Sequence, residues 1–256
     1  MSNTLAIAHK ELKSYFASPI AYVMIAVFAL IFGFFFTSIL DIFREQAAQL
    51  TSLGRSAPAV NLNEQLIRPV LGNVSVILLF TLTLITMRTF AEEKRSGTME
   101  LLLTSPITDL QIVLGKFLGA MGLIAAMLAI TLPHLLLMYY FADPEWKPIA
   151  TAYLGFFLMA ACFVAVGLFI SSLTRNQIIA GMATFGVFLI LWIISWLGGT
   201  MGPTGEAILQ YLSLTGHFED FTRGVIDTRH LVYYTSFIIF GLFLTVRSVE
   251  TERWRG

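Results

Sequence analysis

Apolar and polar residues alternate in long blocks along this chain. Six apolar stretches cover residues 20–40, 70–87, 117–141, 151–170, 178–197 and 231–246. A bilayer core of about 30 Å needs roughly 20 apolar residues at about 1.5 Å per residue, so each stretch has or approaches the length of a span. The last is the shortest, and it spans if Arg247 extends its side chain toward the headgroups. The pattern predicts an all-α integral membrane protein with six transmembrane helices.

The segment before the first stretch has the periodicity of a short helix. Its apolar residues recur on one helical face and its lysines lie on the other: Leu5, Ala8, Leu12 and Phe16 against Lys10 and Lys13. An amphipathic helix of this kind suits the membrane interface. We therefore expect an N-terminal interfacial helix.

The segment 198–230 precedes the last stretch and is also amphipathic. It opens with a glycine-rich turn and then places Phe218, Phe221 and Val225 at helical spacing among charged residues. We expect a short external helix here, with Phe218 and Phe221 as candidates for an external gate. An inert interfacial helix explains the pattern about as well.

The composition excludes several classes of protein. Hydrophobic residues make up 57% of the chain and charged residues 12%, which is more apolar surface than a soluble core of 256 residues can bury. The formal net charge is zero, so there is no long-range field to recruit nucleic acid. The single cysteine, Cys162, excludes an intramolecular disulfide and a cysteine-rich metal site.

The distribution of basic residues predicts the orientation. Lys and Arg are more frequent in the segments that lie inside if the N-terminus is cytoplasmic, chiefly 88–116 and the C-terminal end. Cytoplasmic segments of membrane proteins carry such an excess. We therefore expect both termini on the cytoplasmic side.

Ionisable groups and enzyme motifs are absent where a carrier or an enzyme needs them. The six apolar stretches contain no Asp, Glu, Lys or Arg, and their one imidazole is His134, beside Pro133. Ion-coupled carriers usually place carboxylates near the bilayer midplane, and a lone histidine beside a proline is more often a structural residue. The chain also lacks G-x-x-x-x-G-K-[ST], H-E-x-x-H and G-x-S-x-G. A pump of this composition must obtain its energy from another subunit.

The segment 88–116 between the second and third stretches is highly charged and contains explicit helix breaks. Gly97 predicts a helix stop, Thr98 can cap a new helix with Glu100 in its first turn, and Pro106 ends that helix. Thr108 and Gln111 then form a T-x-x-Q capping box that starts the third span. We expect a short helix across the membrane surface within a cytoplasmic loop.

This short helix has an apolar side of limited size, made by Met99, Leu101, Leu102 and Leu103. It is too small to form a domain, but it suits a groove on a cytoplasmic partner. A helical turn tucked against the headgroups fits the periodicity equally well. The periodicity alone leaves both interpretations open.

The same segment resembles permease subunits of the ABC-2 exporter superfamily. Their motif, E-E-x-x-x-G-T-x-E-x-L-L-x-x-P, is matched at Glu92, Glu93, Gly97, Thr98, Glu100, Leu102, Leu103 and Pro106. Residues 10–23, 171–177 and 212–227 also look like this family, and most like its gliding-motility-associated subgroup. The resemblance implies one ABC-2 transmembrane domain over residues 1–256 and a short coupling helix in segment 88–116.

The resemblance also implies partners and contacts. The chain would be the permease of an exporter in a bacterial inner membrane, paired with a second copy or a paralogous permease. An ATPase subunit would bind ATP and Mg, so no cofactor is expected in this chain. It would contact Glu92, Glu93, Arg95, Gly97, Thr98, Glu100, Leu102 and Leu103, with a second cytoplasmic contact at Arg175 and Asn176. A membrane scaffold, or an ion-coupled carrier or channel, remains the alternative.

Overall fold

Nearly all residues that the structure describes lie in helices. The computed structural model describes residues 3–52, 63–142, 144–197 and 202–254, and within these ranges it contains no strand. In chain order the elements are α1 (Asn3–Ala17), α2 (Pro19–Ser52), the π-helical turn η1 (Asn63–Ile67), α3 (Arg68–Thr89), α4 (Ala91–Ser96), α5 (Thr98–Thr104), α6 (Asp109–Ala129), α7 (Leu132–Ala142), α8 (Trp146–Ser172), α9 (Gln177–Leu197), α10 (Pro203–Leu212), α11 (Leu214–Thr222) and α12 (Thr228–Arg253).

The prediction of six spans is confirmed. Helical segments long and apolar enough to cross a membrane are Pro19–Leu50, Asn63–Ser96, Asp109–Tyr140, Trp146–Ser172, Gln177–Ile194 and Thr228–Arg253. Most of these helices are longer than the apolar stretches because their polar ends continue the helix beyond the hydrocarbon core. The short sixth stretch is part of a 26-residue helix.

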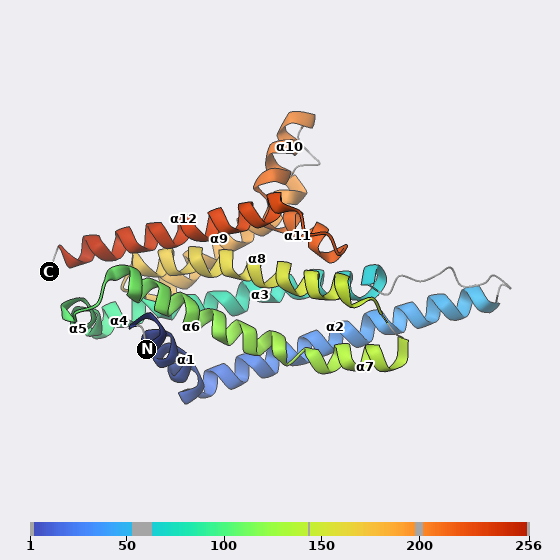
Figure 1. Ribbon diagram of the computed structural model, residues 1–256, viewed down its shortest axis with the longest axis horizontal. Helices are drawn as coiled ribbons and strands as arrows, with labels where there is room; N and C mark the ends of the chain where they lie inside the picture. Colours follow the sequence, from blue (N-terminus) through green and yellow to red (C-terminus); the bar gives the residue numbers. More distant parts are fainter. Residues whose placement is uncertain (1–2, 53–62, 143, 198–201, 255–256) are drawn as a thin grey trace.

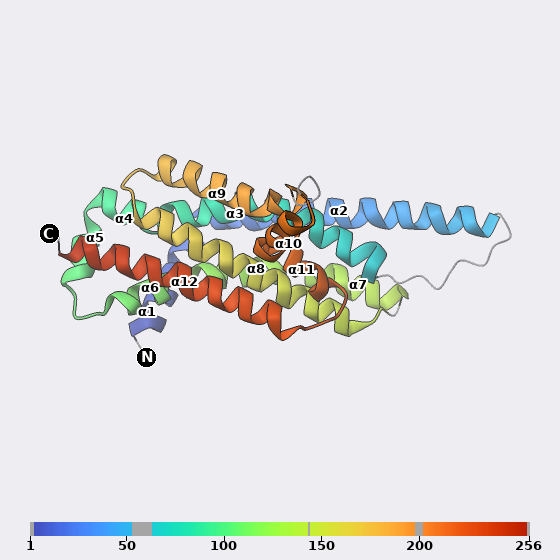
Figure 2. The ribbon, with the colours of Figure 1, turned by 90° about the horizontal axis from the view of Figure 1, so that it is seen from above.

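Helix α8 lies at the centre of the bundle. It contacts α3, α6, α9, α11 and α12, and its residues 159–165 are all buried (Figures 1 and 2). By contrast, α2 and α9 are mostly exposed. In the most apolar 18-residue segment of each helix, only 22% is buried inside the molecule. The exposed faces of α2 and α9 are apolar and suit contact with lipid.

The third span has a break between α6 and α7. Thr131 lies at this break, where its hydroxyl donates to the carbonyl of Leu128 and accepts from the hydroxyl of Tyr153 at 2.7 Å. His134, in α7, packs edge-on between Phe32 and Phe36 of α2, with centroid distances of 5.3 Å to each ring. The ring of His134 thus lies among aromatic side chains, and its structural role stays a prediction.

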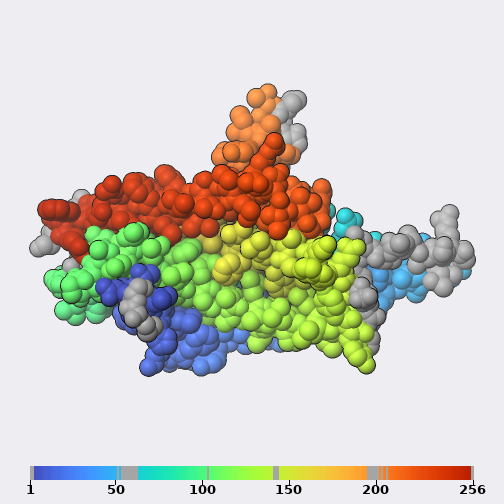
Figure 3. Space-filling view, in the orientation of Figure 1, coloured from blue at the N-terminus to red at the C-terminus, as the bar shows by residue number. Residues whose placement is uncertain are grey.

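The two chain ends lie at the same end of the bundle as α4 and α5 (Figure 1). The far end carries α7 and the part of α2 after residue 40, the α2 extension, and α10 projects from the side of the bundle between the two ends, next to α11 (Figures 1 and 3). The predicted external segment forms two helices, and residues 198–201 of its glycine-rich turn lie outside the described ranges. Val225 is not part of α11, because Gly224 takes a positive φ of 84° just after the helix ends.

Helix α1 packs closely on α6. A Cβ atom added at Gly115 would lie 2.6 Å from Cβ of Ile7, and one added at Gly119 would lie 2.6 Å from Cβ of Glu11. These glycines therefore let two helices of one chain approach. On the apolar face that the sequence indicated, Ala8, Leu12 and Phe16 are partly buried and Leu5 is 51% exposed, whereas Ile7 beside it is buried.

Candidate functional site

The predicted break between α4 and α5 is confirmed at Gly97. Its φ of 74° is left-handed, a conformation that glycine adopts without steric cost. The prediction that Thr98 caps α5 is wrong. Gly97 occupies the cap position, and Thr98 is the first helical residue. The Thr98 hydroxyl instead points back to the carbonyl of Glu93, at 3.5 Å.

One side of helix α5 packs against the bundle, and another side is exposed. Met99 is buried and Leu102 packs partly against the core, whereas Glu100 is exposed and Leu101 is 71% exposed. The side chain of Leu103 lies outside the part of the chain that the structure describes. The outward side of α5 therefore combines a carboxylate with a large apolar side chain.

The predicted capping box at the start of α6 is confirmed. Thr108 Oγ1 accepts from the backbone N–H of Gln111, and Gln111 Oε1 accepts from that of Thr108, both at 3.3 Å. Asp109 then forms an ion pair of 2.9 Å with Arg253 of α12. The capping box and this ion pair together fix the start of α6.

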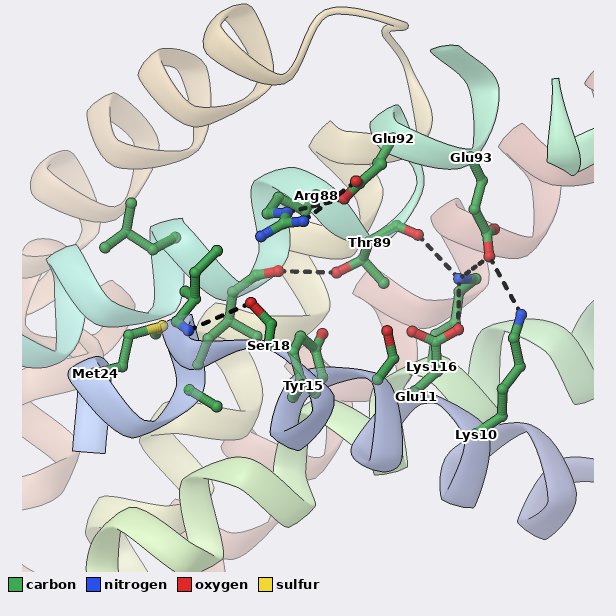
Figure 4. A pocket seen from close by; sticks show the side chains of 15 residues that line it. Lys10, Glu11, Tyr15, Ser18, Met24, Arg88, Thr89, Glu92, Glu93 and Lys116 are labelled. Carbon is green, nitrogen blue, oxygen red and sulfur yellow. Dashed lines mark hydrogen bonds and ion pairs between the residues drawn. The ribbon is translucent and has the colours of Figure 1, made fainter. Parts of the chain in front are cut away.

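A buried cluster of charges joins α1, α4 and α6 (Figure 4). The ammonium nitrogen of Lys116 lies 3.0 Å from Glu11 Oε1, 2.8 Å from Glu93 Oε1 and 2.9 Å from the carbonyl of Thr89. The Lys116 side chain is 1% exposed, and Lys10 approaches Glu93 at 3.9 Å from the exposed side. Burial also raises the pKa of the neighbouring Tyr15 hydroxyl, and the nearby Glu11 carboxylate acts in the same direction.

The bounds 88–116 given for the loop extend too far, because they include Lys116 although the predicted capping box already starts the third span at Thr108. Helix α6 begins at Asp109, so Lys116 lies about two turns inside it. The capping box thus gave the start of the helix more accurately than the apolar stretch 117–141 did. Segment 88–116 is consequently mostly helical rather than a loop.

The other proposed contact residues lie at this same end of the bundle. Glu92 accepts two hydrogen bonds from Arg88, while Arg95 is exposed. Lys94 forms an ion pair of 3.0 Å with Glu252 of α12, and Arg175 approaches the other oxygen of Glu252 at 3.7 Å. Asn176 caps α9 by accepting from the N–H of Ile178 at 2.9 Å. Arg175 is thus linked to Lys94 of α4 through Glu252 at the end of α12.

A cavity of about 230 Å³ opens beside the charge cluster (Figure 4). Polar residues such as Ser14 and Arg88 line one part of it, and Met24 and Ile85 line another. Within the described ranges no three His, Cys, Asp or Glu side chains are placed to hold a metal ion.

The two candidate gate residues are buried in the bundle. Phe218 packs edge-on against Phe156 of α8 with ring centroids 6.0 Å apart, and a Cβ added at Gly155 would lie 2.6 Å from Cβ of Phe221. Both phenylalanines hold α11 on α8. A role as a gate stays a prediction.

Comparison with known proteins finds related transporters. A sequence model of the family described as "ABC-2 family transporter protein" matches residues 5–247. Two relatives, from Escherichia coli strain K12 and from Escherichia coli O157:H7, are each named "Probable multidrug ABC transporter permease YbhR". Each is 28% identical over 157 residues, which are 59% of this chain and 41% of the relative. The match thus spans about two fifths of the length of these relatives.

Proposed function

The chain belongs to the ABC-2 family of transporter proteins and is a transmembrane permease subunit, and from that premise we propose that a separate ATPase subunit drives it as an exporter. The ATPase would dock on the outward side of α5, at the end of the bundle that holds both chain ends. That end would face the cytoplasm of a bacterial inner membrane. ATP and Mg would bind in the partner, so this chain would carry no cofactor.

The exposed and anchored position of α5 carries this proposal. Glu100 and Leu101 face outward from a helix that Met99 fixes to the bundle. A short helix with an exposed apolar residue suits a groove on a partner protein. An anchored helix can pass a displacement to the bundle, whereas a loose one cannot.

The charge cluster supports transmission from α5 to the spans. Glu93 lies one turn before α5 and is bonded to Lys116 of α6 and, through it, to Glu11 of α1. Separating buried charges is costly, so α4, α6 and α1 should move together. ATP binding can then shift the permease only if the docked ATPase prefers one of two permease conformations.

One α5 in each chain suits one ATPase subunit. A working transporter would therefore contain two permease halves, this chain with a second copy or with a paralogous permease, surrounded by membrane lipid. No nucleic acid is expected as a partner. The candidate ATPase contacts are those named from the resemblance, together with Leu101, whose exposure adds it to the set.

Substitutions on the outward side of α5 test this docking. We expect Glu100→Lys and Leu101→Asp together to reduce the ATPase that copurifies with the tagged permease at least about tenfold, because they place a reversed charge and an unpaired carboxylate in the groove. The control carries the same changes on exposed residues of the α2 extension, Glu45→Lys and Ile42→Asp, at the far end of the bundle. Unchanged copurification and transport in the well-expressed α5 variant would contradict docking on α5.

A further inference from the structure

Two histidines face each other where α11 meets the start of α12. His217 lies in α11 and His230 in the first turn of α12, and their Nδ1 atoms are in hydrogen-bond contact. The remaining nitrogen of His217 lies 2.8 Å from the carbonyl oxygen of Tyr211. That of His230 lies 2.7 Å from Oδ2 of Asp220. The result is one chain of hydrogen bonds from the end of α10 to α12 and back to α11.

The direction of these bonds fixes the number of protons. A carbonyl oxygen only accepts, so His217 Nε2 must donate to Tyr211, and an ionised carboxylate only accepts, so His230 Nε2 must donate to Asp220. Each neutral imidazole has a single N–H, and both are now used. The contact between the two Nδ1 atoms would then bring two lone pairs together. It becomes a hydrogen bond only when one further proton is present.

The surroundings indicate where that proton resides. Burial lowers the pKa of His217, and His230 lowers it further, while the bond to Tyr211 and the charge of Asp220 act in the opposite direction. Protonation of His217 alone is therefore disfavoured, so the proton that completes the contact lies between the two rings, and the Asp220 carboxylate ends the chain of bonds. The other groups around the pair are neutral or already paired: Tyr211, Tyr233, Tyr234, and Glu219 with Arg68 and Arg223.

We propose that the His217–His230 pair is a proton-binding site, and that the single proton shared between the two rings fastens α11 to α12. Helix α11 also supplies Phe218, Glu219 and Thr222 to the wall of a cavity of about 450 Å³, whose other wall includes Trp192 of α9. Occupancy of the proton site would therefore control how firmly one wall of this cavity is held.

A proton fits this site better than a metal ion. Asp220 contacts Nε2 of His230 and not the two Nδ1 atoms that face each other. The described residues also place no third ligand of the His, Cys, Asp or Glu type with them.

The bond between the rings exists with one extra proton and is lost with none or two. As the pH rises, the shared proton leaves and the lone pairs face each other. As the pH falls through the lowered pKa of His217, both Nδ1 atoms carry hydrogen and repel. The attachment of α11 should therefore have a bell-shaped pH dependence, with its acidic limb below about pH 6.5.

Hydrogen–deuterium exchange of the full chain in nanodiscs tests this site. Peptides of α11 are followed between pH 5 and 9, with labelling times scaled to the intrinsic exchange rate and peptides of α8 as reference. We expect protection of α11 at the optimum to exceed that at pH 9 about tenfold or more, as for loss of a hydrogen bond to a charged group. His230→Gln should abolish the bell-shaped pH dependence of α11 protection, and His9→Gln, in α1, should leave this dependence unchanged.

A second variant and a chelator distinguish the other outcomes. Asp220→Asn removes the carboxylate that accepts from His230 Nε2, so protection of α11 at its optimum should fall below that of the unchanged chain. Protection of α11 that does not vary with pH, or that varies equally in His230→Gln, would overturn the proposal, as would loss of protection on adding EDTA. The measurement needs neither ATPase nor transport, so its failure and the failure of the proposed function are separable.

Discussion

At the scale of single residues, the ammonium group of Lys116 holds three helices together. Its partners Glu11 and Glu93 have side chains that are only 13% and 16% exposed. Charges this poorly hydrated need a partner, because a buried ion left alone is strongly destabilising. The cluster is therefore a point where one substitution should have a large effect.

Lys116→Met should destabilise the protein by about 3–5 kcal/mol, because it leaves two carboxylates facing each other without a cation. Thermal unfolding in detergent measures the loss. Adding Glu11→Gln and Glu93→Gln should restore much of the stability, since no charge then remains unpaired. Lys10→Gln is the matched control, because the Lys10 side chain is 63% exposed and its removal should cost at most about 1 kcal/mol. A Lys116→Met protein as stable as the control would refute the role of this cluster.

The sequence alone could not reveal this cluster. Glu11 and Lys116 are far apart in the chain, and nothing in their local pattern pairs them. Glu93 was identified through a motif, yet its ion pair with Lys116 depends on how α1 and α6 pack. Long-range ion pairs of this kind follow from tertiary packing and not from periodicity.

At the scale of elements, the close packing of α1 on α6 depends on glycine. A Cβ at Gly119 would meet both Cβ of Glu11 and the carbonyl oxygen of Ala8, at 3.3 Å. The backbone carbonyl cannot rotate away as a flexible side-chain end could. A methyl group at this position must therefore push the helices apart.

Gly119→Ala should destabilise the contact by about 1–3 kcal/mol, the usual cost of overpacking. Limited proteolysis within α1 and thermal unfolding in detergent measure it. Gly186→Ala, in α9, is the control, since a Cβ there meets nothing within 4 Å and alanine favours a helix by about 1 kcal/mol. Equal unfolding temperatures and equal rates of proteolysis in the two variants would show that the packing of α1 on α6 does not depend on Gly119.

Helix boundaries were predictable where a residue has a specific stereochemical role. Gly97 and the Thr108 capping box were located correctly from the sequence, since a left-handed glycine and a reciprocal cap each have a local signature. Thr98 was misassigned because the preceding glycine provided the cap itself. Val225 was included in a helix by its spacing alone, although Gly224 before it signalled the end.

At the scale of the whole molecule, the six spans followed directly from hydropathy. The bilayer fixes the length of an apolar helix, so composition and length suffice to count the spans. The packing order around α8, and the inward face of α1, did not follow, because lipid and protein interior are equally apolar and both accept the same side chains. Exposure to lipid and burial in the bundle therefore look alike in sequence.

The most direct test of the central claim is to purify the tagged chain from its native membrane in mild detergent and identify its partners by mass spectrometry. We expect a soluble subunit with a G-x-x-x-x-G-K-[ST] loop, in equal amount to the permease, whose ATP hydrolysis responds to the transported molecule. Recovery of the chain alone in several detergents, together with transport that continues without an ATPase, would contradict it and favour a scaffold or a channel.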